Sequence, residues 1–292
     1  MEVCRTRCAV VDGQLAVRRR RGKVDASDRL RSLDEGLFAG TAWYYARYRP
    51  AYPRQFLDSL IQRLGLDGTG RLLDLGCGTG QLTLPLAAHV AEAVGMDPEP
   101  EMLTEAARQA REQAIANVRW AQGDSADLPG ALGHFRLVTM GRSFHWMNRE
   151  QVLTALDEMV DDDGSLVIAN DSNLVLPTTP WQQAIQEIQH RFLPRDHLRG
   201  PTPAADARRT HEQVLANSVF RQVNRQVYRF RRSWTIEQVI GYFYSTSLPL
   251  RRLLGDRQSA FEETVTNALL TIEPSGHFTE PVALEVLIAT KS

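Results

Sequence analysis

Three glycines at alternate positions, with an aspartate before them and another beyond them, form the most suggestive chemical pattern in the sequence. Leu72, Leu73 and Leu75 form a short apolar run interrupted only by Asp74, and Gly76-Cys77-Gly78-Thr79-Gly80 follows, which predicts a buried strand, a glycine loop and then a helix. Glycines let a ligand approach the main chain, and the first N–H groups of the helix can bind it. Asp97 follows about twenty residues later, where a carboxylate can accept hydrogen bonds from both hydroxyls of a ribose.

The glycine spacing distinguishes two kinds of ligand. Dinucleotide-binding proteins use G-x-G-x-x-G, whereas this sequence has D-x-G-x-G-x-G, and Asp74 suits an amine-bearing ligand better than a pyrophosphate. The pattern resembles motif I of the class I S-adenosylmethionine-dependent methyltransferases, although a plain strand-to-helix turn also fits the glycines alone. The resemblance implies S-adenosyl-L-methionine as the cofactor, S-adenosyl-L-homocysteine as its product, and a cofactor loop made of Asp74, Gly76, Cys77, Gly78, Gly80 and Gln81.

An aromatic segment precedes the loop. Residues 45–53 read Tyr45-Ala46-Arg47-Tyr48-Arg49-Pro50-Ala51-Tyr52-Pro53, similar to the Y-x-x-Y-R-P-x-Y-P segment of the type 11 methyltransferase subgroup, which includes trans-aconitate-methyltransferase-like enzymes. This resemblance implies that Tyr45 and Arg49 lie near the carboxylate end of the cofactor, where the planar fork of an arginine can form two hydrogen bonds. The alternative is that the aromatic rings only pack on the domain.

The adenine end of the site is predicted from a third segment. Residues 123–129 resemble the G-D-A-x-x-L-P loop of the same family, which implies that Asp124 accepts the adenine amino group and that the N–H of Ser125 donates to a ring nitrogen. The alternative for Asp124 is a helix cap or a turn. Apolar surface beside the adenine is expected from Pro98 and Met102, and Met140, at the end of the fourth strand, completes the cofactor set.

The acceptor side is predicted around His145. The segment Ser143-Phe144-His145-Trp146-Met147-Asn148 follows the fourth strand and resembles the S-F-H-W-M-D segment of the subgroup, while Phe135-Arg136 departs from the Phe-Asp usual before that strand. An imidazole titrates near neutral pH, so His145 is the candidate catalytic base, although a packed structural histidine is equally compatible. Phe144, Trp146 and Trp181 are expected to bind the acceptor.

The elements that carry these residues alternate. Apolar runs at 72–75, 94–97, 118–122, 137–140 and 165–169 predict five strands separated by helices, and 222–229 and 281–289 predict two more, the last antiparallel. The expected fold is α/β: a Rossmann-like, doubly wound, seven-stranded and mostly parallel sheet, with a helical cap insertion after strand five at about 170–218.

Composition limits the function classes. The 292 residues are 43% hydrophobic and carry a formal net charge of −1, so no strong attraction to nucleic acid or to an anionic membrane is expected. We expect residues 1–33, with Arg18-Arg19-Arg20-Arg21, to form a flexible basic leader and 34–292 to form the methyltransferase domain. A contact of the leader to an acidic partner is the alternative. Three cysteines provide neither a disulfide framework nor a metal site, and they fit a cytoplasmic protein.

Three functions fit these observations. The first is a methyltransferase for a small-molecule acceptor, such as a natural-product intermediate of secondary metabolism, working without a membrane, with a homodimer as one arrangement. The second is a tRNA or protein methyltransferase, against which the near-neutral charge counts. The third is a protein of the same fold that binds the cofactor without transferring the methyl group; turnover distinguishes it from the first.

Overall fold

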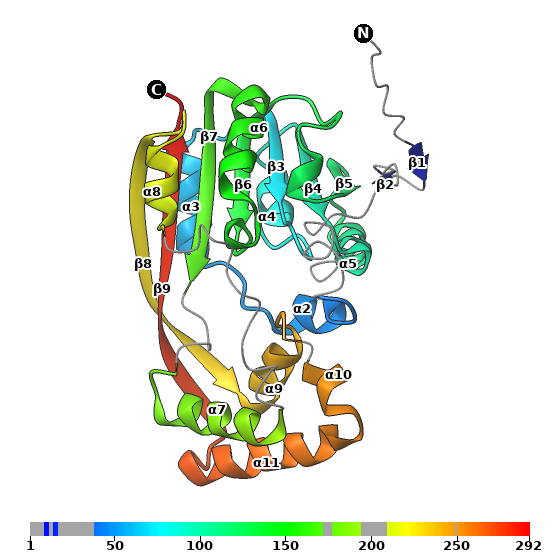
Figure 1. Cartoon of the computed structure of the whole chain (residues 1–292), viewed down its shortest axis with the longest axis vertical. Coiled ribbons are helices and arrows are strands. Elements are labelled where there is room, and N and C mark those ends of the chain that lie inside the picture. Colours follow the sequence, from blue (N-terminus) through cyan, green and yellow to red (C-terminus); the bar gives the residue numbers. More distant parts are fainter. Residues whose placement is uncertain (1–8, 12–13, 17–37, 172–176, 194–208, 249) are drawn as a thin grey trace.

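The computed structural model describes residues 9–11, 14–16, 38–171, 177–193, 209–248 and 250–292 (Figure 1). One nine-stranded sheet runs through it in the order β1-β2-β5-β4-β3-β6-β7-β9-β8. Its strands are β1 (Ala9–Val11), β2 (Gln14–Ala16), β3 (Arg71–Leu75), β4 (Glu92–Asp97), β5 (Val118–Gln122), β6 (Phe135–Gly141), β7 (Val160–Asp171), β8 (Gln222–Thr235) and β9 (His277–Thr290). Its helices are α2 (Ala42–Tyr48), α3 (Arg54–Arg63), α4 (Thr83–Ala87), α5 (Pro100–Glu112), α6 (Arg149–Met159), α7 (Pro180–Phe192), α8 (His211–Ala216), α9 (Ile236–Tyr244), α10 (Leu250–Leu254) and α11 (Gln258–Ile272).

The seven predicted strands are confirmed as β3 to β9, and β1 and β2 add to the sheet next to β5. Strands β3 to β7 pair in parallel, while β9 is antiparallel to both β7 and β8. The strand order reverses at β3, where β4 lies on one side and β6 on the other. In open α/β sheets a ligand binds at such a switch point, outside the carboxyl ends of the strands. The glycine loop after β3 and the His145 segment after β6 both lie there.

Alternating side chains of β3 explain why the sheet is covered on both faces. Leu72 packs with Phe56 and Leu60 of α3 and with Leu86 of α4, all fully buried. Leu73, the next residue, packs on the opposite face in a cluster that includes Leu156 of α6. Successive strand residues point to opposite faces, so a strand buried on both sides needs an uninterrupted apolar run.

Strands β8 and β9 extend beyond the other strands of the sheet and carry a second helical layer (Figure 1). We call α7, α9, α10 and α11 the cap helices; they enclose their own apolar cluster, which includes Trp181, Tyr242, Phe261 and Phe278. The cap helices arise largely after β8, whereas the sequence analysis placed the cap at about 170–218. Within that range α7 belongs to the cap, and α8 packs through Val214 and Leu215 on the sheet. Residues 172–176 and 194–208 lie outside the described residues, so the bounds of the insertion stay a prediction.

Two other regions differ in detail from expectation. Helix α4 is only five residues long and contains Pro85, and β4 begins at Glu92, two residues before the predicted start. In the predicted leader, β1 and β2 pair with each other and β2 pairs in parallel with β5. The remaining leader residues, including Arg18-Arg19-Arg20-Arg21, lie outside the described residues, so the expectation for the leader as a whole stays a prediction.

Candidate functional site

The glycine loop curls back over the end of β4. The N–H groups of Gly76 and Cys77 both donate to the carbonyl of Met96, at 2.8 and 3.0 Å. Gly76 has a φ of +71°, and a Cβ built on it would lie 2.5 Å from the Cβ of Ser143. Only glycine therefore fits where the loop passes the segment after β6.

Asp97 holds this loop at its centre. One carboxylate oxygen accepts the N–H of Gly78 at 2.8 Å, and the other accepts the N–H of Glu99 at 2.9 Å. The side chain is 9% exposed, and burial raises the pKa of Asp97 to about 6 despite these two hydrogen bonds. The strand-end position predicted for a ribose-binding acid is therefore occupied by a carboxylate already fixed by main-chain donors.

Asp74 lies deeper than Asp97. Its oxygens accept hydrogen bonds from the N–H and hydroxyl of Thr83, at 3.0 and 2.6 Å, and from the hydroxyl of Thr139 at 2.7 Å. The side chain is 2% exposed, and burial raises its pKa. Through these contacts Asp74 joins β3, β6 and the start of α4. Its side chain has no open surface left for the amine contact expected from the sequence.

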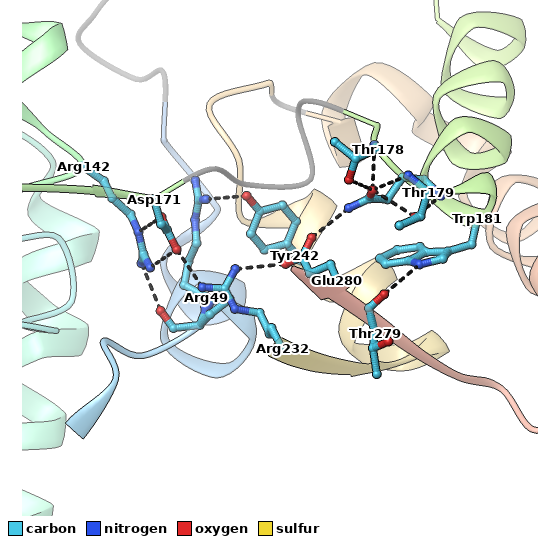
Figure 2. Close-up of polar contacts among 12 residues, drawn as sticks. Arg49, Arg142, Asp171, Thr178, Thr179, Trp181, Arg232, Tyr242, Thr279 and Glu280 are labelled. Carbon is cyan, nitrogen blue, oxygen red and sulfur yellow. Dashed lines mark hydrogen bonds and ion pairs between the residues drawn. The ribbon is translucent and has the colours of Figure 1, made fainter. Parts of the chain in front are cut away.

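The aromatic segment covers the glycine loop. The ring of Tyr45 lies 3.4 Å from where a Cβ on Gly78 would be, which places it beside the glycine loop, and its contact with the cofactor stays a prediction. The Arg49 guanidinium lies between the rings of Tyr45 and Tyr242, 5.0 and 4.9 Å from their centroids. Its Nη1 donates to the Tyr242 hydroxyl at 3.0 Å, while its Nε is buried without a hydrogen-bond partner (Figure 2). Among the described residues no carboxylate forms an ion pair with Arg49.

The segment predicted to bind adenine forms a capped turn. Asp124 accepts the N–H of Ala126 at 2.7 Å, and its own N–H donates to Asp127 at 2.9 Å, so it caps the short 3₁₀ helix Ser125–Asp127. Both Asp124 and Ser125 remain half-buried, and Pro98 is exposed. Met102 and Met140 are 2% and 0% exposed, which places them in the core, so their contact with the cofactor stays a prediction.

The predicted acceptor residues separate into two groups. His145 and Trp146 are exposed on a short 3₁₀ helix, with ring centroids 4.9 Å apart, and the Ser143 hydroxyl anchors this helix to the carbonyl of Leu75 at 2.7 Å. The surrounding protein desolvates the imidazole and lowers the pKa of His145, and the charges of Arg149 and Arg49 lower it further.

Phe144 and Trp181, the other two residues expected to bind the acceptor, lie in apolar cores of this structure, so their role stays a prediction. Phe144 is fully buried in the core below the loop and contacts His211 instead of facing a pocket. Trp181 is 5% exposed, packs on Phe278 and donates through Nε1 to the carbonyl of Thr279 at 3.4 Å (Figure 2). Both aromatic rings pack inside an apolar core, so neither forms a wall of an acceptor pocket in this structure.

A buried ionic network was missed in the sequence analysis (Figure 2). Asp171 at the end of β7 accepts two hydrogen bonds from Arg142, at 2.7 and 2.9 Å, and one from Arg232 of β8 at 2.6 Å. Arg232 also pairs with Glu280 of β9 at 3.1 Å. Burial opposes the ionisation of Asp171, but the charges and hydrogen bonds of the two arginines outweigh it and lower its pKa. The only sequence signal was an arginine directly before the Ser143 segment.

The described residues contain neither a candidate metal site nor a membrane-spanning helix. No group of three or more histidine, cysteine, aspartate or glutamate side chains in that part of the chain could hold a metal ion. None of its helices is long and apolar enough to cross a membrane.

Comparison with known proteins points to one family. Residues 72–164 match the family described as a methyltransferase domain. An uncharacterised methyltransferase-like protein of Schizosaccharomyces pombe is 28% identical over 51% of this chain and 56% of its own length, and the demethylmenaquinone methyltransferase of Lactococcus lactis is 34% identical over 46% and 54%. The chain thus spans about half the length of these curated relatives. A solved structure from Anaeromyxobacter dehalogenans, described as a candidate type II methyltransferase, shares the fold with a TM-score of 0.56 at 18% identity, over 84% of this chain and 98% of that one.

Proposed function

This chain contains a class I S-adenosylmethionine-dependent methyltransferase domain, and from that premise we propose that it transfers the methyl group of S-adenosyl-L-methionine to a small-molecule acceptor. When bound, the cofactor supplies an electrophilic methyl group on a sulfonium. Asp97, Tyr45, Arg49 and the glycine loop would hold the cofactor while a lone pair of the acceptor took that methyl group and the electron pair of the carbon–sulfur bond returned to sulfur.

The observation that carries this proposal is the arrangement around the glycine loop. Asp97 is fixed beside Gly78 at the end of β4, and Arg49 lies against Tyr45 above the same loop with a buried Nε that lacks a partner. Leaving a buried donor of a charged group unpaired is costly, so an acceptor group at this place would stabilise the site. The carboxylate of a bound amino acid moiety is such a group, since a guanidinium pairs with it through parallel hydrogen bonds.

In the proposed complex each residue of the cofactor site has one role. Asp97 accepts from the ribose hydroxyls, Tyr45 and Arg49 bind the carboxylate, and Asp124 with the Ser125 N–H reads the adenine. Cys77 and the glycines contribute loop backbone with little side-chain bulk, and Gln81 contributes its side-chain amide, which donates to the carbonyl of Arg49. Transfer from a sulfonium is a direct displacement, so these residues act mainly by holding the donor in attack geometry.

His145 is the proposed base. Desolvation and two nearby arginines lower its pKa, so its imidazole is neutral near pH 7 and can accept a proton from the acceptor. Trp146 is 41% exposed next to His145 and offers an apolar face to an acceptor. A formal net charge of −1 favours a small molecule over tRNA, and a natural-product intermediate in the cytoplasm is the acceptor class that we propose.

The proposal is tested by identifying the molecule that receives a labelled methyl group. Purified protein is incubated with methyl-labelled S-adenosyl-L-methionine and an extract of the producing cells, which is then separated into small-molecule, RNA and protein fractions. We expect label in a small molecule other than the remaining S-adenosyl-L-methionine, and none in that product with Asp97→Ala. Label in RNA or protein would favour the second function considered above, and binding without any transfer would favour the third.

A further inference from the structure

Arg142 contacts several separate segments of the chain, whereas a structural ion pair requires only one partner. It follows β6 directly and is itself in the left-handed region, with a φ of +56°, which residues other than glycine adopt where their surroundings fix them. Its guanidinium meets Asp171 through Nε and Nη2 at 2.7 and 2.9 Å. The fork leaves Nη1 directed toward other parts of the chain.

Nη1 of Arg142 reaches the segment that carries the proposed carboxylate-binding arginine. It donates to the carbonyl of Pro50 at 3.0 Å and to the side-chain oxygen of Gln81 at 3.2 Å. The amide nitrogen of Gln81 in turn donates to the carbonyl of Arg49 at 3.2 Å. Arg142 therefore holds the carbonyl group of Pro50 directly and that of Arg49 through Gln81.

Packing supports the same arrangement. The guanidinium carbon of Arg142 lies 4.5 Å from the ring centroid of Tyr52, which is 6% exposed and belongs to the same aromatic segment. Asp171 is held from the other side by Arg232, whose second contact is Glu280 of the strand that leads from the cap helices. All four charged side chains are 10% exposed or less, so their geometry is protected from solvent.

We propose that Arg142 is a positioning residue that acts through Arg49: by holding Pro50 and Gln81 it fixes the backbone from which Arg49 reaches the cofactor. This inference rests on the proposed function, because it assigns Arg142 a role in cofactor affinity without any contact to the cofactor. A lysine cannot take its place, since an ammonium lacks the planar fork that binds Asp171 while a separate nitrogen reaches Pro50.

A double-mutant cycle tests the proposal with S-adenosyl-L-homocysteine as the probe. We expect Arg142→Lys to weaken binding about tenfold in the wild-type background, about 1.4 kcal/mol, and less than about twofold in an Arg49→Ala background. Such non-additivity is what a role through Arg49 requires. An unchanged affinity, or an equal loss in both backgrounds, would overturn the proposal.

Arg71 provides a matched control. It pairs with Glu92 at 2.6 Å, donates to the carbonyls of Leu132 and His134, and stacks on Phe135, but it lies at the opposite end of β3 from the glycine loop. Arg71→Lys should lower stability without changing the affinity for S-adenosyl-L-homocysteine. An affinity loss equal to that of Arg142→Lys would show a general effect of lost arginine packing and would overturn the proposal.

Two other outcomes are informative: an Arg142 variant that does not fold, and a wild type that does not bind the probe. Should Arg142→Lys fail to fold, Asp171→Asn tests the same link, because it removes the charge that holds the fork and keeps the shape; the same non-additivity with Arg49→Ala is expected, and an equal loss in both backgrounds overturns the proposal. Wild-type protein that does not bind S-adenosyl-L-homocysteine would contradict the proposed function itself. By contrast, a wild type that binds and an Arg142 variant that binds equally well would contradict only the positioning role of Arg142.

Discussion

The Arg49 guanidinium donates a hydrogen bond of 3.0 Å to the hydroxyl of Tyr242, which joins the segment above the glycine loop to helix α9 of the cap. Tyr242 is 1% exposed, and its ring stacks on Arg49 and lies edge-on to Trp234. The cap therefore supplies one wall of the pocket that holds Arg49. With the cofactor role that we propose for Arg49, this contact would couple cofactor binding to the arrangement of the cap helices.

Tyr242→Phe tests that dependence. The ring stays and the hydroxyl is lost, so the affinity for S-adenosyl-L-homocysteine should fall by about 3- to 10-fold, the loss of one buried hydrogen bond. Tyr244→Phe is the matched control: Tyr244 is 4% exposed on the same helix, and its hydroxyl donates to Glu262. Equal losses in the two variants, measured by calorimetric titration, would mean that Tyr242 acts through the stability of the cap alone.

Gly76→Ala should remove cofactor binding. The substitution combines a φ of +71° with a Cβ placed 2.5 Å from that of Ser143, so the loop must move or unfold locally, and the free energy of unfolding should fall by about 1–3 kcal/mol. Gly68→Ala is the control, because Gly68 has a φ of +90° but no atom within 4 Å of its added Cβ. Urea unfolding and titration with S-adenosyl-L-homocysteine should show normal binding in the control. Normal binding by Gly76→Ala would disagree with the loop geometry.

The carboxyl group of Asp97 should make the stability of the ligand-free protein depend on pH. Burial raises its pKa from 3.8 to about 6, so between these pH values the native state keeps a proton that the unfolded chain has released. Its contribution to stability is fully present below about pH 4 and is lost as the pH rises through about 6, a change of roughly 2–3 kcal/mol. Urea unfolding of the wild type and of Asp97→Asn at pH 4 and pH 7 isolates this difference. Parallel pH profiles for the two proteins would refute the assignment.

His145→Ala should lower kcat by about 10²–10⁴ if the imidazole is the base, with little change in the affinity for S-adenosyl-L-homocysteine. Because desolvation and the two arginines lower the pKa of His145 below 6.5, the rate should rise with pH through a value below 6.5 and then level off. His134→Ala, an exposed histidine before β6, should leave both unchanged. A fall of only a few-fold would leave His145 as a scaffold residue.

The sequence predicted the sheet and the loop because both depend on local patterns. Uninterrupted apolar runs fix buried strands, and Gly76 must be glycine since its backbone is left-handed and Ser143 passes close to it. The burial of Phe144 and Trp181 could not be read locally, because an aromatic residue beside a ligand and one in a core look alike until distant segments are placed. Arg142, Asp171 and Arg232 form one network across separations of 29 and 61 residues, which no spacing pattern encodes.

The central claim is that this protein binds an S-adenosyl nucleoside at the carboxyl ends of β3, β4 and β5. The most direct measurement is a calorimetric titration of the wild type and of Asp97→Ala with S-adenosyl-L-methionine, S-adenosyl-L-homocysteine and NADH. We predict that the wild type binds the two S-adenosyl compounds and not NADH, and that Asp97→Ala binds either S-adenosyl compound at least about tenfold more weakly, the loss of hydrogen bonds to a charged group. Binding of NADH without binding of S-adenosyl-L-methionine would contradict the claim.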